Sequence, residues 1–317
     1  MTATPKDLSL DQIMVHFGTD EAAREYLEAV RWPDSPVCPH CGNDDAARIY
    51  NIKPNPEKKI RAGLRECKEC GDQFTVTVGT VFEKSKIPLR KWLVAWYMLC
   101  SSKKGISAHQ MQRMLELGSY RSAWFMMRRI RYALRNPMFA DKLGSGDGTV
   151  EVDETYVGGK VRGKGRTYKG NKTAVVALVE RGRRVRLRSV KKVTGKTLKS
   201  VLDAHLDPSA HLMIDDFPGY RKRGKGIASN RTVNHIAGEY VRGDVYTNTV
   251  EGYFSLFKRG VNGIFHHIGH RYMDQYLAEF GFRYNQRKAT DGARMIAGLR
   301  TVEGKRLMLK RTSAMGC

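Results

Sequence analysis

Three acidic residues in separate segments, Asp153, Asp215 and Glu251, could together bind divalent metal ions. Asp153 lies in the middle of a predicted strand, Asp215 ends another strand, and Glu251 lies near the start of a predicted helix. Mg2+ prefers carboxylate oxygens, and two such ions roughly 3.5 to 4 Å apart stabilise the attacking and leaving oxygens of an in-line phosphoryl transfer. The pattern predicts this chemistry, with two Mg2+ ions, for which Mn2+ can substitute, bound by the three acids.

The second acid has two candidates, because Asp215 and Asp216 are adjacent. Lys258 follows Glu251 by seven residues, so both lie on one face of a helix after two turns of 3.6 residues. We expect Lys258 to contact a phosphate beside the cleaved bond. The alternative is that Lys258 is a solvated helix residue.

Two further acids flank Asp153. Strand alternation points Glu154 to the opposite face, whereas Glu151 shares the face of Asp153. Glu154 is therefore left out of the predicted site, and Glu151 stays a reserve candidate. On spacing alone, Asp153 and Glu251 could equally be surface charges.

Four cysteines form two Cys-x-x-Cys pairs, each followed by a glycine, and predict one structural Zn2+ ion: Cys38, Cys41, Cys67 and Cys70. Two tight turns that each present two thiolates complete a tetrahedral zinc site. A pair of disulfides is the alternative, which the absence of any sign of secretion disfavours. His40, inside the first pair, is expected to be a solvent-facing turn residue.

The chain carries 56 Lys and Arg against 32 Asp and Glu, a net charge of +24 over 317 residues. This charge favours a polyanionic partner, with DNA the first candidate and a membrane surface the second. The longest apolar run, residues 92 to 100, is shorter than the roughly 20 residues that span a bilayer. No signal peptide opens the chain, so we expect a cytoplasmic protein in contact with DNA in the nucleoid and with no membrane.

The amino-terminal half is expected to be helical on both sides of a zinc ribbon. Apolar spacing predicts two short helices within residues 8–32, a strand over 73–81, and helices over 89–100, 107–115 and 122–134. The last two, separated by a turn that contains Gly118, are typical of a helix-turn-helix, and Arg128 and Arg129 on the second could contact DNA. An ordinary three-helix bundle is the alternative.

The remainder is expected to be an α/β domain that follows a linker over residues 144–149. The predicted strands span residues 150–157, 172–179, 185–190 and 210–214, with helices over 194–206 and from about 247. Acids then lie on the first and fourth strands, which places them side by side if those strands are parallel.

Three groups of basic residues are candidates for DNA contact, although a solvated charge run is the alternative for the glycine-rich one. They are Lys160, Arg162, Lys164 and Arg166; Arg221, Lys222 and Arg223; and Lys258 with Arg259. The basic stretch from Arg181 to Lys199 adds further positive charge.

The fold class expected is an α+β multidomain chain. Its predicted parts are a helical segment over 1–35, a zinc ribbon over 36–86, a helix-turn-helix-like DNA-binding segment over 87–143, a catalytic domain over 144–290 and a basic tail over 291–317.

Several longer motifs resemble one family of bacterial transposases, the insertion sequence 1595 family. They are Cys38-Pro-His-Cys-Gly, Gly79-Thr-Val-Phe-Glu-Lys-Ser-Lys-Ile-Pro-Leu-Arg-Lys-Trp, Ser101-Ser-Lys-Lys-Gly-Ile-Ser, Val152-Asp-Glu-Thr-Tyr-Val-Gly-Gly-Lys, Thr247-Asn-Thr-Val-Glu-Gly-Tyr-Phe-Ser-Leu-Phe-Lys-Arg-Gly and Phe282-Arg-Tyr-Asn. The resemblance implies a ribonuclease H-like catalytic domain with a DDE triad, here Asp153, Asp215 and Glu251, and a fourth motif residue, Lys258. Asp215 matches an Asp-x-aromatic-x-Gly-Tyr pattern that favours it over Asp216.

The resemblance implies a DNA transposase that nicks the terminal inverted repeats of its element and joins the freed 3′ hydroxyl to target DNA. Because two element ends must be paired, we expect a homodimer or larger assembly on double-stranded DNA. Two alternatives stay open: a DNA-binding regulator with a non-catalytic α/β domain, and a nuclease that cleaves without strand transfer.

Overall fold

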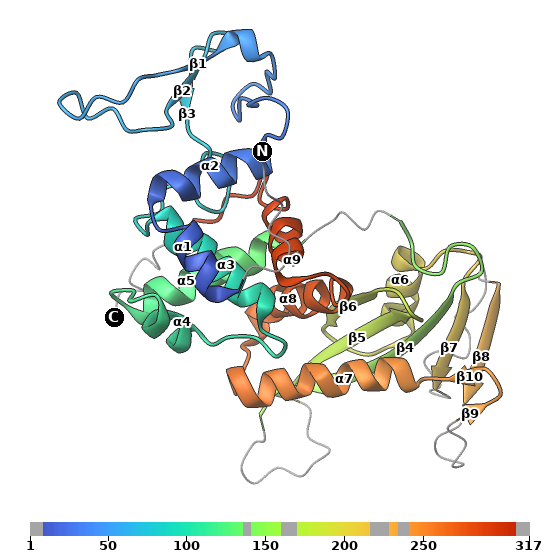
Figure 1. The fold of residues 1–317 in the computed structure, drawn as a ribbon. Coiled ribbons are helices and arrows are strands. Elements are labelled where there is room, and N and C mark those ends of the chain that lie inside the picture. The colour runs from blue at the N-terminus through green and yellow to red at the C-terminus, as the bar shows by residue number, and fades with distance from the viewer. Residues whose placement is uncertain (1–8, 136–140, 160–169, 216–227, 234–240, 309–317) are drawn as a thin grey trace, which may run out of the picture. The chain divides into compact units, whose positions relative to one another are not determined.

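A computed structural model describes residues 9–135, 141–159, 170–215, 228–233 and 241–308 (Figure 1). The chain divides into two compact units, one formed by Met1–Leu134 with Ala289–Cys317 and the other by Arg135–Lys288. Along the chain, the second unit is thus inserted between two parts of the first unit. The stretch expected to be a basic tail contributes, as far as the structure describes it, to that first unit.

The first unit begins with the two short helices that the sequence predicts. Helix α1 spans Leu10–His16 and α2 spans Asp20–Arg31. Ser9 forms a capping box with Gln12, and the Thr19 side chain accepts a hydrogen bond from the first turn of α2. Both helices start where a side-chain oxygen satisfies the free N–H groups of the first turn.

The ribbon is a small antiparallel sheet with the order β1-β2-β3. Its strands are β1 (Ile49–Asn51), β2 (Arg65–Cys67) and β3 (Gln73–Phe74). The strand expected over 73–81 ends at Phe74, so that part of the prediction is wrong. Thr75 and Thr77 bond through their hydroxyls at 3.0 Å, and the Thr80 hydroxyl donates to the Thr77 carbonyl oxygen at 2.6 Å. These local bonds stabilise turns in place of strand pairing.

Four helices complete the described part of the first unit: α3 (Leu89–Ser101), α4 (Ala108–Met114), α5 (Tyr120–Ala133) and α9 (Asp291–Leu299). Helix α3 is buried from Trp92 to Cys100, so the long apolar run is a core helix. Helix α9 packs against α3, and Arg294 donates a hydrogen bond of 2.6 Å to the Cys100 carbonyl oxygen. None of the described helices has the length and apolar character needed to cross a membrane.

The second unit contains a five-stranded sheet with the order β6-β5-β4-β7-β8. The strands are β4 (Thr149–Val157), β5 (Thr173–Glu180), β6 (Val185–Val190), β7 (His211–Asp215) and β8 (Ser229–Val233). Strands β4, β5 and β6 pair antiparallel, whereas β4, β7 and β8 pair parallel. The α+β class is confirmed, and the strands that carry Asp153 and Asp215 are neighbours. Strand β8 was not predicted.

Helices cover both faces of this sheet (Figure 1). Helix α6 (Gly195–His205) packs with Val152, Val176 and Ile214 on one face. Helices α7 (Asn248–Gly260) and α8 (Met273–Asn285) pack on the face that carries Val175, Ala177 and Val179. A two-stranded ladder, β9 (Val241–Arg242) with β10 (Val245–Tyr246), leads into α7.

The segment expected to be a linker, residues 144–149, forms a turn over 144–147 and leads directly into β4 at Thr149 within the second unit, so that prediction is wrong. Gly144 has φ +80°, and a Cβ there would lie 2.4 Å from the Ala210 side chain. Next to it, Leu143 is fully buried and its N–H donates to the His205 carbonyl oxygen at 2.8 Å. The glycine therefore permits a close approach and a left-handed backbone, and does not mark a flexible connection.

Candidate functional site

Two of the predicted acids lie side by side on one face of the sheet. In the parallel pairing of β4 with β7, Val152 is opposite Ile214, so Asp153 and Asp215 follow at the next position of each strand. Val152 and Ile214 face α6. Because side chains alternate along a strand, Asp153 and Asp215 point to the other face, where α7 packs. Asp216 lies outside the described residues.

Helix α7 brings the third acid to the same face. Glu251 lies in its first turn, is exposed, and its carboxylate accepts a hydrogen bond of 3.2 Å from the Thr247 hydroxyl. Lys258 and Arg259 are exposed in the last turn of the same helix. The structure therefore places Lys258 two turns along the helix from Glu251, as the spacing predicts.

The pKa of the Asp153 carboxyl group is raised by burial and by the neighbouring acids. Burial raises its pKa, a hydrogen bond of 2.7 Å from the Glu154 N–H opposes this shift, and the negative charges of Glu154, Glu251 and Asp215 raise it further, to about 7. Like charges held together in a partly buried site favour a bound cation, because a cation relieves their repulsion. The oxygen donors of these acids fit a hard ion such as Mg2+.

Glu151, the reserve candidate, is not part of this acidic surface. Its side chain is fully buried, and its carboxylate binds Arg181 and the first residues of α7. Because both of its oxygens accept hydrogen bonds from the protein, this carboxylate attaches α7 to β4 and is not available to bind a metal ion.

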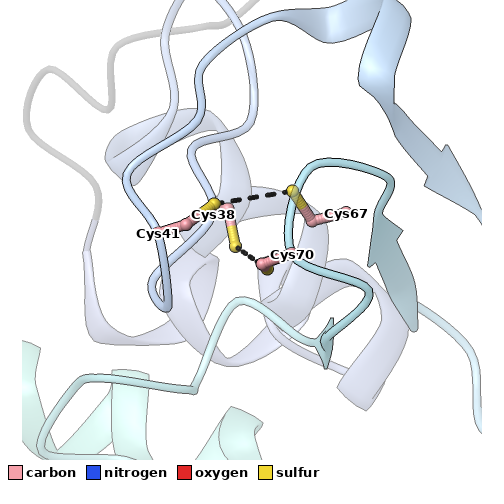
Figure 2. A group of neighbouring side chains, drawn as sticks. All are labelled: Cys38, Cys41, Cys67 and Cys70. Carbon is pink, nitrogen blue, oxygen red and sulfur yellow. Dashed lines mark hydrogen bonds between the residues drawn. The ribbon is translucent and has the colours of Figure 1, made fainter.

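Four sulfur atoms converge between the two knuckles of the ribbon (Figure 2). All four ligand atoms lie within 4.8 Å of one another, with Sγ–Sγ distances of 3.8 Å for Cys38–Cys70 and 3.7 Å for Cys41–Cys67. Tetrahedral Zn2+ with bonds of about 2.3 Å separates its sulfur ligands by about 3.8 Å. The cluster therefore has the dimensions of a zinc site. His40 is exposed and lies outside it.

Backbone N–H groups donate hydrogen bonds to sulfur atoms of this cluster and lower the pKa of those thiols. The Cys67 pKa is raised by burial but is lowered overall to about 7, because it accepts hydrogen bonds from the N–H groups of Cys70 and Glu69 and from neighbouring side chains. The Cys70 pKa is lowered by the Asp72 N–H, yet burial and the other three sulfurs raise it overall to about 12. Four thiolates therefore need a cation to coexist.

The two helices predicted over 107–115 and 122–134 form as α4 and α5, which Ser107 and Ser119 cap. Arg128 is half-buried. Arg129 is buried, and its Nε donates a hydrogen bond of 2.9 Å to the Leu307 carbonyl oxygen. The prediction that Arg129 contacts DNA is therefore not supported by its position, because α5 turns this residue toward the core. Sequence reasoning passed over Arg121, which is exposed in the first turn, where recognition helices contact bases.

Seven of the predicted DNA-binding residues lie outside the described residues: Lys160, Arg162, Lys164, Arg166, Arg221, Lys222 and Arg223. Their contacts stay predictions. Lys258 and Arg259 are the two α7 members of the predicted set, and both side chains are exposed.

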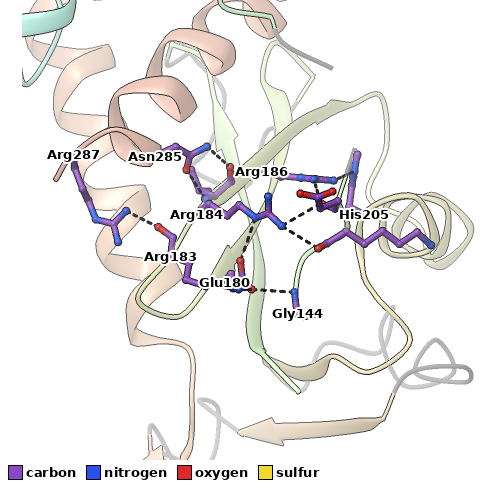
Figure 3. A network of polar contacts seen from close by, with 11 residues as sticks. Gly144, Glu180, Arg183, Arg184, Arg186, His205, Asn285 and Arg287 are labelled. Atoms are coloured by element: carbon purple, nitrogen blue, oxygen red, sulfur yellow. Dashed lines mark hydrogen bonds and ion pairs between the residues drawn. The ribbon is translucent and has the colours of Figure 1, made fainter. Parts of the chain in front are cut away.

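The basic stretch after β5 binds largely to the chain itself (Figure 3). Glu180 is buried, and its carboxylate accepts hydrogen bonds from the Gly144 N–H and from Arg183 and Arg184. Arg287 donates to the Arg183 carbonyl oxygen at 2.6 Å. These guanidinium groups stabilise the turn and the sheet edge. The number of basic residues in this stretch is therefore larger than the number of basic side chains available to contact DNA.

His205, at the end of α6, lies between two further arginines of the basic stretch, Arg186 and Arg188. Arg188 Nε donates to His205 Nε2 at 2.8 Å, and Arg186 lies 3.2 Å from Nδ1. Burial, followed by the positive charges of Arg188, Arg186 and Lys142, lowers the His205 pKa from 6.5 to about 4. The folded protein therefore keeps this imidazole neutral where the unfolded chain protonates it.

We expect the free energy of unfolding to fall as pH is lowered from about 6.5 to about 4, because the unfolded state binds the His205 proton more tightly. Between pH 7.5 and 5 the loss from this group is up to about 2 kcal/mol. Urea unfolding at both pH values measures it, with His205→Gln as the comparison. The variant should lose less stability than the wild type, and equal losses would contradict the prediction.

Comparison with known proteins identifies both parts of the chain. Residues 18–73 match a transposase zinc-ribbon domain and residues 146–285 match an ISXO2-like transposase domain. The chain is also 29% identical over 260 residues to an uncharacterized protein in the transposable element ISH50 of Halobacterium salinarum, covering 77% of this chain and 83% of that one. Both matching domains are those of insertion sequence 1595 elements. Residues 18–73 and 146–285 are thus similar to the zinc ribbon and the DDE domain of insertion sequence 1595 transposases, and the second match is to the domain of a transposase or nuclease-type enzyme acting on DNA.

Proposed function

We propose that this transposase nicks the terminal inverted repeats of its element in a Mg2+-dependent reaction and then joins the freed 3′ hydroxyl to target DNA, in the cytoplasm. The observation that carries the proposal is the position of Asp153 and Asp215 at adjacent positions of parallel strands, under the helix that carries Glu251. Three acids from separate segments on one face are what a two-metal site requires.

In this proposal Asp153, Asp215 and Glu251 hold the ions. Bound Mg2+ supplies the positive charge that stabilises the oxygens gaining negative charge during phosphoryl transfer. In the first step a water oxygen bonds to the phosphorus and the bond from phosphorus to the 3′ oxygen breaks. The 3′ oxygen takes up the proton that the water loses, which leaves a 3′ hydroxyl and a 5′ phosphate. In the second step the oxygen of this hydroxyl bonds to a target phosphorus, the bond from that phosphorus to the target's own 3′ oxygen breaks, and the leaving oxygen takes up the proton that the hydroxyl loses.

Other residues of the chain are proposed to bind and orient the DNA. Lys258, exposed on α7 seven residues from Glu251, contacts a phosphate beside the reacting bond, and Arg259 adds a second positive charge. The zinc ribbon, with one structural Zn2+ per protomer, and the helix-turn-helix bind the terminal repeats. Because two element ends must be joined, the active species is a homodimer or larger.

The test compares the wild type with Glu251→Gln on DNA that carries the terminal repeats, in Mg2+, and scores nicks and joined strands separately. We expect metal-dependent nicking and joining by the wild type and neither by the variant, because an amide is a poorer ligand than a carboxylate. Mass measurement of the complex with the element ends should give two or more protomers.

Three results would contradict the proposal. Nicks without joined strands would indicate a nuclease that does not perform strand transfer. Tight binding without cleavage by the wild type would indicate a DNA-binding regulator. A single protomer that joins at the full rate would exclude the proposed dimer.

A further inference from the structure

The carboxylate of Glu151 lies two residues before Asp153 on β4 and is fully buried. Its Oε1 accepts hydrogen bonds from Arg181 Nε at 2.6 Å and from the Thr249 hydroxyl at 2.8 Å. Its Oε2 accepts from the N–H groups of Thr249 at 2.7 Å and Val250 at 3.0 Å. Four donors from two segments therefore converge on one carboxylate.

Two of these donors are the free N–H groups at the start of α7. The helix begins at Asn248, and its N-cap residue, Thr247, forms no side-chain capping bond to the backbone. Glu151 on the neighbouring strand takes over this role, and its negative charge lies at the positive end of the helix dipole. The start of α7 is thus bound to β4 by a side chain, where most helices use a residue of their own.

Arg181 extends the attachment to the segment before α7. Its Nη1 and Nη2 donate to the carbonyl oxygens of Asp244 at 2.8 Å and Tyr246 at 2.9 Å, and its guanidinium lies 3.6 Å from the centre of the Tyr246 ring. All three nitrogens of the guanidinium group are used, one for Glu151 and two for the approach to α7. Glu151 and Arg181 together form what we name the α7 clamp.

We propose that Glu151 is a positioning residue for the metal site, and that the α7 clamp sets the place of Glu251 relative to Asp153. This rests on the proposed function above. Along the chain, Glu251 directly follows Val250, whose N–H Glu151 binds, and Asp153 lies two residues after Glu151 on the same face of β4. The Glu151 carboxylate therefore links the strand that carries Asp153 to the backbone directly before Glu251.

The clamp contributes geometry more than stability. A buried ion pair gains little free energy over well-packed apolar residues, because desolvation offsets the attraction between the charges. A displacement of about 1 Å in a catalytic group, by contrast, costs about a hundredfold in rate. A clamp of this kind is therefore expected to show its effect at the metal site.

The test uses full-length protein and Mn2+ alone as the probe. Glu151→Gln keeps the size of the side chain but removes the charge, and we expect at least a tenfold weaker Mn2+ affinity by electron paramagnetic resonance titration. Amide hydrogen exchange of a peptide spanning residues 247–252 should become at least tenfold faster. Cleavage by the variant should be partly restored by higher Mg2+, since a displaced ligand raises the metal requirement more than it lowers the maximal rate.

Glu180→Gln is the matched control, because Glu180 is also buried and paired with two arginines in the same sheet, and the hydrogen bonds that the structure describes for its carboxylate come from Gly144, Arg183 and Arg184 rather than from α7. It should leave Mn2+ affinity and exchange at 247–252 unchanged within about twofold, a margin of less than 0.5 kcal/mol. A melting transition shows whether Glu151→Gln folds. If it does not, Thr249→Val is the second variant, because it removes only the hydroxyl contact to Glu151. The loss of this one hydrogen bond should weaken Mn2+ binding about threefold.

Wild-type Mn2+ affinity and wild-type exchange in these variants would overturn the positioning role and leave the proposed transposition chemistry intact. A wild type that neither binds Mn2+ nor cleaves would instead overturn the metal site itself, and the inference with it. Equal loss in Glu151→Gln and Glu180→Gln would indicate general destabilisation of the sheet and would also overturn it.

Discussion

Asp153→Asn is expected to lower nicking and joining at least about a thousandfold, which corresponds to about 4 kcal/mol of transition-state stabilisation. The amide keeps the size of the side chain but removes a charged oxygen ligand from the face that Asp153 shares with Asp215 and Glu251. Asp215→Asn should have an effect of the same size. Rates on DNA carrying the terminal repeats measure both, and filter binding should show that affinity for this DNA changes less than about threefold, since the phosphate contacts are untouched.

Two comparisons make this prediction decisive. Asp203→Asn removes an exposed acid of the same unit, which pairs with Lys199 on α6, and should leave the rates unchanged. Asp216→Asn should lower them less than about tenfold, because Asp215 is the acid in register with Asp153. A larger loss in Asp216→Asn than in Asp215→Asn would show that the ligand has been assigned to the wrong neighbour.

Cys67→Ser is expected to remove zinc from the protein and to unfold the ribbon. The binding free energy of a structural zinc ion, about 10 to 16 kcal/mol, is largely folding free energy, and the three short strands β1, β2 and β3 offer little else. We expect about one zinc per protomer in the wild type, and less than about a tenth of that in the variant by atomic absorption. Limited proteolysis should then cut within residues 36–73.

The zinc content of His40→Asn tests whether His40 is a zinc ligand or a residue of the turn. His40 lies between the paired cysteines but outside the group whose ligand atoms converge, so this variant should retain its zinc. Zinc loss in His40→Asn, or zinc retained in Cys67→Ser, would contradict the assignment of four thiolates.

The positions of the proposed catalytic acids could be predicted because local patterns specify them. The alternation of residues 150–157 gives the face of Asp153, and the end of a short apolar strand gives Asp215. Their juxtaposition needs only one further fact, that β4 and β7 pair parallel. The cysteine spacing is equally local, since each pair forms one turn with its own backbone bonds.

The rest depends on partners distant in sequence. Arg129 looks like a surface cation until Leu307 is seen to accept its hydrogen bond, and Glu151 looks like a spare acid until Thr249 and Val250 are placed beside it. Gly144 is read as a linker because the close approach of Ala210 has no signature in the local sequence. Charge and glycine patterns describe only the local composition. The burial of a residue depends on contacts with segments that are distant in the sequence.

Residues 289–317 follow the second unit in sequence but belong to the first unit, and this order affects folding during translation. Helix α3 needs α9 to cover it, and α9 leaves the ribosome only after every catalytic residue has been made. A nascent chain that ends before Ala289 therefore contains all three acids, but its helix α3 lacks the packing of α9 and exposes apolar surface. We therefore expect the first unit to complete its fold only after the second unit has been synthesised, because α9 is the last of its described helices to leave the ribosome.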